Sequence, residues 1–266
     1  MKKLIIVLAV MIFLFSDVAY ASDQVSFEID TSQSDIGVLT VSHPQFENQK
    51  YKILIQKDGA KCYFDIVPDK QSECFPLAMG DGEYTIKIFK NISSNQYSTV
   101  YNNDVNVSLL DQDQPYKQSV QSIEWDYSME AIKAAKTLTE NLSTDEEKVK
   151  AIYNYVIKNI KYDYTKTADT ISSTYLPDIE DTYSTGTGMC YDFASLFSSM
   201  LRSVDIPAKL VKGYTTNFNG YHAWNEVYIN DNWETIDTTY DSIKRHSYRN
   251  YSMTKEADDY TAKYTY

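Results

Sequence analysis

The sequence predicts an α+β protein in which strands alone fill the first part, and helices followed by antiparallel strands fill the second. Apolar and polar residues alternate in short runs from Val25 to about Leu110. From about residue 131 the apolar period lengthens to between three and four, and near residue 222 it returns to two. The polar segment 111–115, which ends in proline, is the expected linker. We therefore divide the chain into residues 22–112 and 116–266, after an N-terminal segment of 21 residues.

That N-terminal segment, residues 1–21, has the features of a signal peptide. Residues 1–3 (MKK) carry two lysines, residues 4–15 form an unbroken apolar run, and residues 19–21 (AYA) offer small side chains at the spacing of a signal peptidase site. The apolar run falls short of the ~20 residues that a membrane-spanning helix needs. We expect cleavage after Ala21, a mature chain without a membrane span, and a protein that is secreted or associated with the cell envelope. An uncleaved N-terminal anchor is the alternative.

The net charge of the chain argues against some classes of binding partner. Its formal net charge is −12 at pH 7, and the loss of residues 1–21 makes it one unit more negative. An acidic protein is a poor ligand for nucleic acid or for anionic membranes. The sequence has no phosphate-binding loop and no His and Cys cluster with metal-ligand spacing, so neither a metal nor another cofactor is expected.

Residues 22–112 are predicted to form a small β-sandwich. The strand-length runs are 25–29, 38–41, 51–55, 63–67, 84–89 and 105–107, with turns at 58–59 and 80–82. No catalytic grouping occurs among them. The domain is expected either to bind the cell surface or a substrate, or to position the second domain, and we favour positioning because no sugar-binding or metal-binding pattern is found there.

The three cysteines fall into two settings. Cys62 and Cys74 lie in the first domain, and Cys190 stands alone in the second. In an oxidising compartment the first two are expected to form a disulfide, which leaves Cys190 as the thiol with a chemical role. The alternative is that all three are small buried side chains.

Two helices are predicted at the start of the second domain. Apolar stripes at helical spacing run over 131–138 and 149–160, and Thr144 with Glu147 forms a capping-box pattern before the second stripe. The segment 165–187 is polar and has little apolar periodicity. We predict that it is a long loop of functional importance.

Cys190 is predicted to begin a third helix. It follows the segment 186–189 (GTGM), and the apolar residues from Phe193 to Val204 are spaced as one buried face. The N–H groups and the positive dipole end at a helix start favour a thiolate over a thiol, and they can stabilise an oxyanion. Taken alone, a cysteine after glycines is more often structural than catalytic.

Residues 221–229 and 232–237 are predicted to form a hairpin that closes at Asn230-Asp231. This register pairs Trp224 with Asp237 and places His222 one diagonal step away on the same face. A hydrogen bond between the imidazole and the carboxylate is then feasible, whereas a slip by one residue would separate them.

Cys190, His222 and Asp237 are therefore the expected nucleophile, base and orienting acid of a thiol triad. The two other histidines, His43 and His246, lack a comparable cysteine and carboxylate setting. A lone histidine in a strand is more often structural, so the hypothesis depends on all three residues together.

The motifs resemble those of the bacterial transglutaminase-like domain. They are residues 188–196 (GMCYDFASL), 206–214 (IPAKLVKGY), 222–227 (HAWNEV), Trp233 and Asp237, preceded by residues 152–164. The resemblance covers about residues 125–245. Two positions depart from the family pattern, since Asp205 stands where glycine is usual and Thr238 stands where proline commonly follows the aspartate.

The resemblance implies a papain-like α+β fold in which the cysteine helix packs on an antiparallel sheet that carries the histidine and the aspartate. It also implies acyl transfer, with attack of Cys190 on an amide or peptide carbonyl of a protein, a peptide or a cell-wall peptide. Water as acceptor makes the protein a protease, amidase or deamidase, and an amine makes it a cross-linking transglutaminase. An exported binding protein that uses the same fold without turnover is the remaining alternative.

Overall fold

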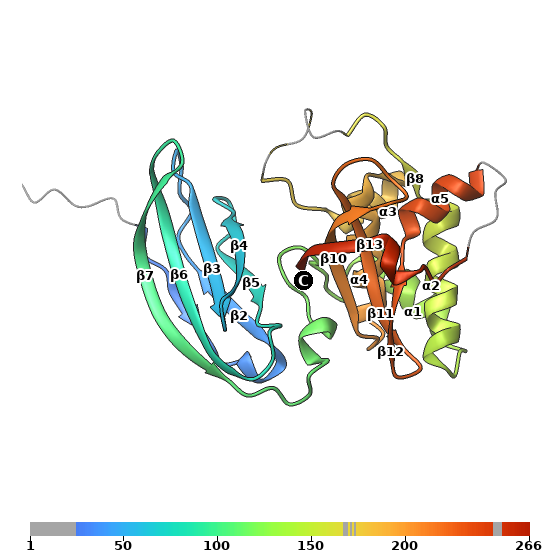
Figure 1. Ribbon diagram of the computed structural model, residues 1–266, viewed down its shortest axis with the longest axis horizontal. Coiled ribbons are helices and arrows are strands. Elements are labelled where there is room, and N and C mark those ends of the chain that lie inside the picture. The colour runs from blue at the N-terminus through green and yellow to red at the C-terminus, as the bar shows by residue number, and fades with distance from the viewer. Residues whose placement is uncertain (1–24, 167–169, 171, 173, 247–251) are drawn as a thin grey trace, which may run out of the picture.

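The computed structural model describes residues 25–166, 170, 172, 174–246 and 252–266. An all-β part and an α+β part lie side by side (Figure 1). The α+β class predicted from the sequence is confirmed. The proposed signal peptide lies outside the described residues, and the domain limits 22–112 and 116–266 stay predictions.

The all-β part consists of two antiparallel sheets. One sheet has the order β1 (Glu28–Asp30), β2 (Val38–Ser42) and β5 (Ser72–Pro76), with the short 3-10 helix η1 (Ser34–Ile36) between its first two strands. The other has the order β4 (Ala60–Ile66), β3 (Tyr51–Lys57), β6 (Gly82–Ser93) and β7 (Gln96–Val107). All six predicted runs contribute to these sheets or border them, whereas β5 was not predicted.

The core of this part lies between the inner faces of its sheets. Phe64 of β4 and Phe75 of β5 face each other with ring centroids 5.3 Å apart. The turn between β3 and β4 is the predicted one, because Asp58 and Gly59 both have positive φ, of 50° and 86°. Two such residues in a two-residue hairpin match the right-handed twist of the strands.

The predicted disulfide is wrong, because Cys62 and Cys74 are both free thiols in the structure. Cys62 lies on the inner face of its sheet and packs against the core. Cys74 alternates with the buried Glu73 and Phe75, so it lies on the outer face of the other sheet, where its sulfur is 3.6 Å from Thr40 Oγ1. The spacing of twelve residues places the two thiols on different sheets and different faces, which the sequence pattern did not reveal.

The α+β part is built on one four-stranded antiparallel sheet. Its order is β12 (Asn232–Ile236), β11 (His222–Ile229), β10 (Ala208–Thr215) and β13 (Tyr260–Thr265). The helices are α1 (Glu130–Thr139), α2 (Asp145–Asn159), α3 (Ile179–Thr185), α4 (Cys190–Arg202) and α5 (Thr238–His246), with the 3-10 helices η2 (Gln114–Lys117) and η3 (Ala257–Asp259). A two-residue parallel pair, β8 (Lys161–Tyr162) and β9 (Thr187–Gly188), lies before α4.

The predicted helices form for the expected local reasons. Thr144 accepts a hydrogen bond from the backbone N–H of Glu147, whose side chain accepts one from the backbone of Thr144, so the capping box at the start of α2 is present. The predicted loop 165–187 is wrong in its last third, because α3 forms there. Asp178 caps that helix and Gly186 ends it in a left-handed conformation with φ of 65°.

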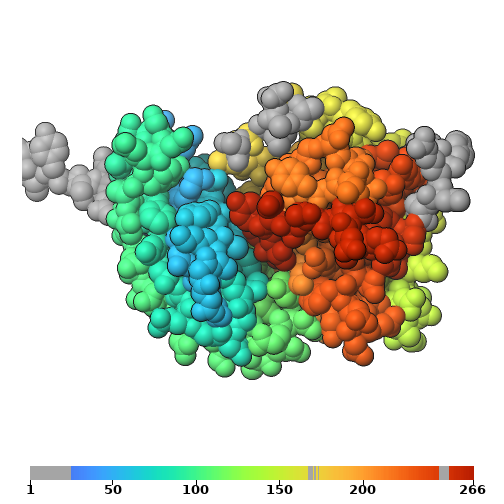
Figure 2. All heavy atoms as spheres, in the orientation of Figure 1, coloured from blue at the N-terminus to red at the C-terminus, as the bar shows by residue number. Residues whose placement is uncertain are grey.

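One apolar cluster extends across both parts, and the α+β part has a second cluster of its own. Tyr266, next to the end of β13, is 7% exposed and lies 5.5 Å from Phe64, measured between ring centroids. Figure 2 shows the C-terminal residues extending from the α+β part to the all-β part. The buried guanidinium of Arg202 donates to the carbonyl oxygens of Ala208, Gln118 and Tyr266, at 2.9, 2.6 and 3.0 Å. These bonds join the end of α4 to the start of β10, to the segment between the two parts and to the residue after β13.

None of the helices in the described part of the chain is long and apolar enough to cross a membrane.

Candidate active site

The N-terminus of α4 is held in place by backbone geometry and by a buried carboxylate. A Cβ atom on Gly188 would lie 2.7 Å from the Cβ of Asp192, so only glycine allows this approach. Asp192 is fully buried, and it accepts hydrogen bonds from the backbone N–H of Met189 at 2.9 Å and from the Tyr175 hydroxyl at 2.6 Å. Cys190 is therefore the first residue of a well-fixed helix, as predicted.

One buried amide attaches α4 to the sheet. Asn225 of β11 is fully buried, and its Nδ2 donates to the carbonyl oxygen of Ala194 at 2.9 Å and to Ser198 Oγ at 2.6 Å, both on α4. His222 lies on the same strand as Asn225, and Cys190 lies on the same helix as Ala194. The amide thus fixes the distance between the thiol and the imidazole.

The predicted hairpin register is confirmed. The turn lies at residues 230–231, both with positive φ, and Tyr228 of β11 pairs with Trp233 of β12. The register places His222 and Asp237 at the same end of the hairpin. The two side chains meet, with 2.8 Å between His222 Nε2 and Asp237 Oδ2.

Each oxygen of the Asp237 carboxylate has a separate role. Oδ1 accepts the backbone N–H of Tyr240 at 2.9 Å, which caps α5 at its N-terminus. Oδ2 faces His222 and also accepts the hydroxyl of Tyr260 at 3.1 Å. The residue is fully buried, and the positive end of α5 favours a negative charge there. Thr238, which departs from the family pattern, is the first residue of α5 and leaves this arrangement intact.

His222 is buried, 5% exposed, and lies under the ring of Phe218 with 4.7 Å between ring centroids. Burial lowers the pKa of His222, but the charge of Asp237, the hydrogen bond to it and the hydrogen bond to Cys190 together raise that pKa to about 10. Since Asp237 takes Nε2, Nδ1 is the ring nitrogen left for Cys190. The structure therefore brings together all three residues that the sequence singled out.

Two neighbours of these residues were not predicted. Tyr260 comes from β13, a strand that the sequence analysis missed, although the alternating run from Tyr260 to Thr265 has the composition of a strand. Lys212 of β10 is an electrostatic neighbour of Cys190. Lys212 lies in the motif 206–214, but strand alternation does not show which groups its side chain meets.

Within the described ranges, no group of three or more His, Cys, Asp or Glu side chains is arranged to hold a metal ion.

Residues 132–238 match the family model described as the transglutaminase-like superfamily. Kyphoscoliosis peptidase from Homo sapiens is 32% identical over 117 residues, which is 40% of this chain and 17% of the human protein. The Mus musculus protein is 31% identical over 117 residues with the same coverage. The chain thus spans 17% of the length of these relatives.

Several solved structures match this chain at low identity and with TM-scores below 0.5. A candidate cysteine protease from Cytophaga hutchinsonii is 19% identical with a TM-score of 0.43, over 76% of this chain and 74% of that one. The periplasmic domain of TgpA from Pseudomonas aeruginosa is 13% identical with a TM-score of 0.40, over 83% and 95%. Red sea bream transglutaminase is 12% identical with a TM-score of 0.33, over 76% and 48%.

Proposed function

We propose that this chain, in which residues 132–238 form a domain of the transglutaminase-like superfamily, is a thiol enzyme that hydrolyses amide or peptide bonds of a protein or peptide substrate. The observation that carries the proposal is the position of the His222 ring between two partners. Its Nε2 contacts Asp237, and the ring also forms a hydrogen bond with Cys190. The relative that is named a peptidase favours water over an amine as the acceptor.

In the first half of the reaction Cys190 gives its proton to His222, and its sulfur attacks the carbonyl carbon of the substrate. The oxyanion that forms lies at the start of α4, where backbone N–H groups and the helix dipole stabilise negative charge. The carbon–nitrogen bond then breaks, and the leaving amine takes a proton from His222. A thioester on Cys190 remains.

In the second half a water molecule attacks the thioester, and His222 accepts the proton of that water. The carbon–sulfur bond breaks, which releases a carboxylic acid and restores Cys190. Asp237 keeps the imidazole in one orientation and stabilises its protonated form through both halves. Tyr260 and the N-terminus of α5 hold Asp237 in turn.

Cross-linking follows the same first half and differs only in the acceptor. A primary amine in place of water would give a new amide, because the thioester is open to either nucleophile. The superfamily includes transglutaminases by its own description, so this acceptor is the second candidate.

The test is to incubate the protein with glutamine-containing peptides and a primary amine, and to identify products by mass spectrometry. Hydrolysed or deamidated peptide supports the proposal, and amide-linked amine supports the cross-linking alternative. Cys190→Ala is the control and should give neither. If the unmutated protein binds a peptide but gives no product with any peptide of a diverse library, the proposal fails and a binding role takes its place.

A further inference from the structure

A pocket lies between the two parts of the protein, next to the proposed active site. Its walls come from β4, from the segment 121–122, from the segment 174–176 and from Tyr191, Lys212 and Tyr266. Tyr191 directly follows Cys190 in the sequence, and Lys212 is an electrostatic neighbour of Cys190. The pocket therefore adjoins the nucleophile without including any of the three triad residues.

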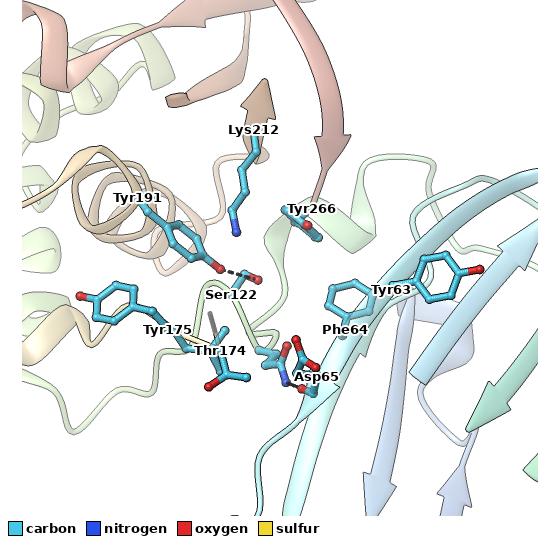
Figure 3. A pocket seen from close by; sticks show the side chains of 11 residues that line it. Tyr63, Phe64, Asp65, Ser122, Thr174, Tyr175, Tyr191, Lys212 and Tyr266 are labelled. Atoms are coloured by element: carbon cyan, nitrogen blue, oxygen red, sulfur yellow. Dashed lines mark hydrogen bonds between the residues drawn. The ribbon is translucent and has the colours of Figure 1, made fainter. Parts of the chain in front are cut away.

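Lys212 is the unusual member of this pocket. Its Nζ lies 3.4 Å from the ring centroid of Tyr191 and 5.2 Å from that of Tyr266. Among the described residues it makes no hydrogen bond and no ion pair. Figure 3 shows its side chain pointing into the space bordered by Tyr191, Ser122 and Tyr266.

The other charged side chain of the pocket already has a partner. The carboxylate of Asp65 pairs with Lys52 across β3 and β4, at 2.5 Å. Ser122 accepts a hydrogen bond from the Tyr191 hydroxyl at 3.0 Å. Lys212 is the charged side chain that has no ion-pair partner among the described residues of the pocket, and its charged neighbour Cys190 lies outside the pocket lining.

The charge of the half-buried ammonium group is only partly compensated, by two aromatic rings and by the neighbouring charge of Cys190. Burial lowers the pKa of Lys212 to about 8, against the opposing effect of the charge of Cys190. Cation–π contacts replace only part of the lost hydration. An anion that enters the pocket would supply the missing counter-charge and accept hydrogen bonds from the ammonium group.

We propose that this pocket is a substrate subsite that binds a carboxylate group, with Lys212 as its counter-ion. The inference rests on the proposed function only in assigning that carboxylate to the substrate. The carboxylate belongs either to a chain terminus or to an acidic side chain, and both present the same chemistry to Lys212. Phe64 and Asp65 on the opposite wall give the all-β part a direct role in shaping the subsite.

The test measures binding without turnover, in the full chain carrying Cys190→Ala. The probes are N-acetyltyrosine, its neutral amide, and the α-amide of N-acetylglutamate, which carries a side-chain carboxylate. Binding is followed by NMR shifts of the backbone amides of Tyr191, Lys212 and Tyr266. We expect one or both carboxylates to bind about tenfold or more tightly than the neutral amide, because a charge-assisted hydrogen bond is lost with the amide.

The matched variants are Lys212→Met and Lys209→Met, each combined with Cys190→Ala. Lys209 lies on the same strand but pairs with Glu226 at 3.2 Å and lies over Trp233, outside the pocket. Lys212→Met should abolish the preference for carboxylates, and Lys209→Met should keep it. Equal binding of acid and amide, no saturable binding of either carboxylate, or a preference that survives Lys212→Met would overturn the inference. None of these outcomes depends on whether the protein turns over a peptide.

Discussion

Nε2 of His222 lies 2.8 Å from Oδ2 of Asp237, although the two residues are fifteen positions apart in the sequence. His222 is the first residue of β11, and Asp237 directly follows β12. Both are buried, with 5% and 0% of their surface exposed. A buried pair is shielded from water, so the charges of neighbouring groups strongly affect the protonation of its members.

The first prediction is that Cys190, His222 and Asp237 act as one unit. Cys190→Ala should abolish turnover and leave the free energy of unfolding nearly unchanged, and His222→Ala should lower kcat/KM by about a thousandfold or more. The variant that combines Cys190→Ala with His222→Ala should lose hardly more activity than Cys190→Ala alone, because without the thiol there is no nucleophile for the other two residues to assist. Cys62→Ala is the control for loss of a thiol elsewhere. Losses that multiply in the double variant would contradict the prediction.

The second prediction concerns stability and pH. Because the pKa of His222 is raised to about 10 in the folded protein, the folded state holds this proton more tightly than the unfolded state does. The stabilisation is complete below the unfolded pKa of about 6.5 and is lost as the pH rises through about 10. The difference in free energy of unfolding between the unmutated protein and His222→Gln should therefore shrink from pH 6 to pH 10 in urea titrations. A difference that is independent of pH would refute the raised pKa.

The third prediction tests the support of Asp237. Tyr260→Phe removes a hydroxyl that donates to a buried carboxylate, and it should lower the free energy of unfolding by about 1.5 kcal/mol. Tyr264→Phe, on the same strand but 43% exposed, should change it by no more than about 0.5 kcal/mol. Urea denaturation of both variants makes the comparison. Equal effects of the two substitutions would show that the bond to Asp237 adds nothing.

The fourth prediction is that thiol titration with Ellman's reagent, under denaturing and non-reducing conditions, finds all three cysteines free. Cys190→Ala should lower the count by one. A count of a single thiol in the unmutated protein would mean that Cys62 and Cys74 pair after all, which would require one of them to move to the other face of its sheet.

The fifth prediction concerns export. We propose that the protein is secreted or held loosely at the cell envelope, so the exported form should begin near Ser22. N-terminal sequencing of the protein from the medium and from the envelope fraction checks this. An exported protein that begins at Met1 would support the uncleaved anchor instead.

Local signals explain why much of the site was predictable. Two residues suited to a tight turn, Asn230 and Asp231, fix the hairpin register, and the register brings His222 and Asp237 to one end. The apolar face after Cys190 fixes the helix start. The backbone of Asp205 has a φ of 66°, in the left-handed region. This conformation explains why glycine is usual at the position, and aspartate is one of the few other residues that adopt it.

What the sequence did not reveal depends on contacts between distant segments. Cys62 and Cys74 each alternate correctly along their strands, but the face that each thiol occupies is set by how two sheets pack. β13 joins β10 across more than forty residues, so nothing near Tyr260 indicates that it will meet Asp237. The surroundings of Lys212, which are two aromatic rings and the nearby Cys190, are likewise a property of the assembled pocket.

The place of β13 in the sheet has a consequence for the order in which the site is completed. The ribosome makes α4 and the β11–β12 hairpin before residues 260–265, and until those residues emerge the edge of β10 has unpaired N–H and C=O groups and Asp237 lacks the Tyr260 hydroxyl. A growing chain therefore contains the nucleophile, the base and the acid before it contains the group that completes their support. Synthesis of β13 therefore covers the open edge of β10 and adds the Tyr260 hydroxyl that supports Asp237.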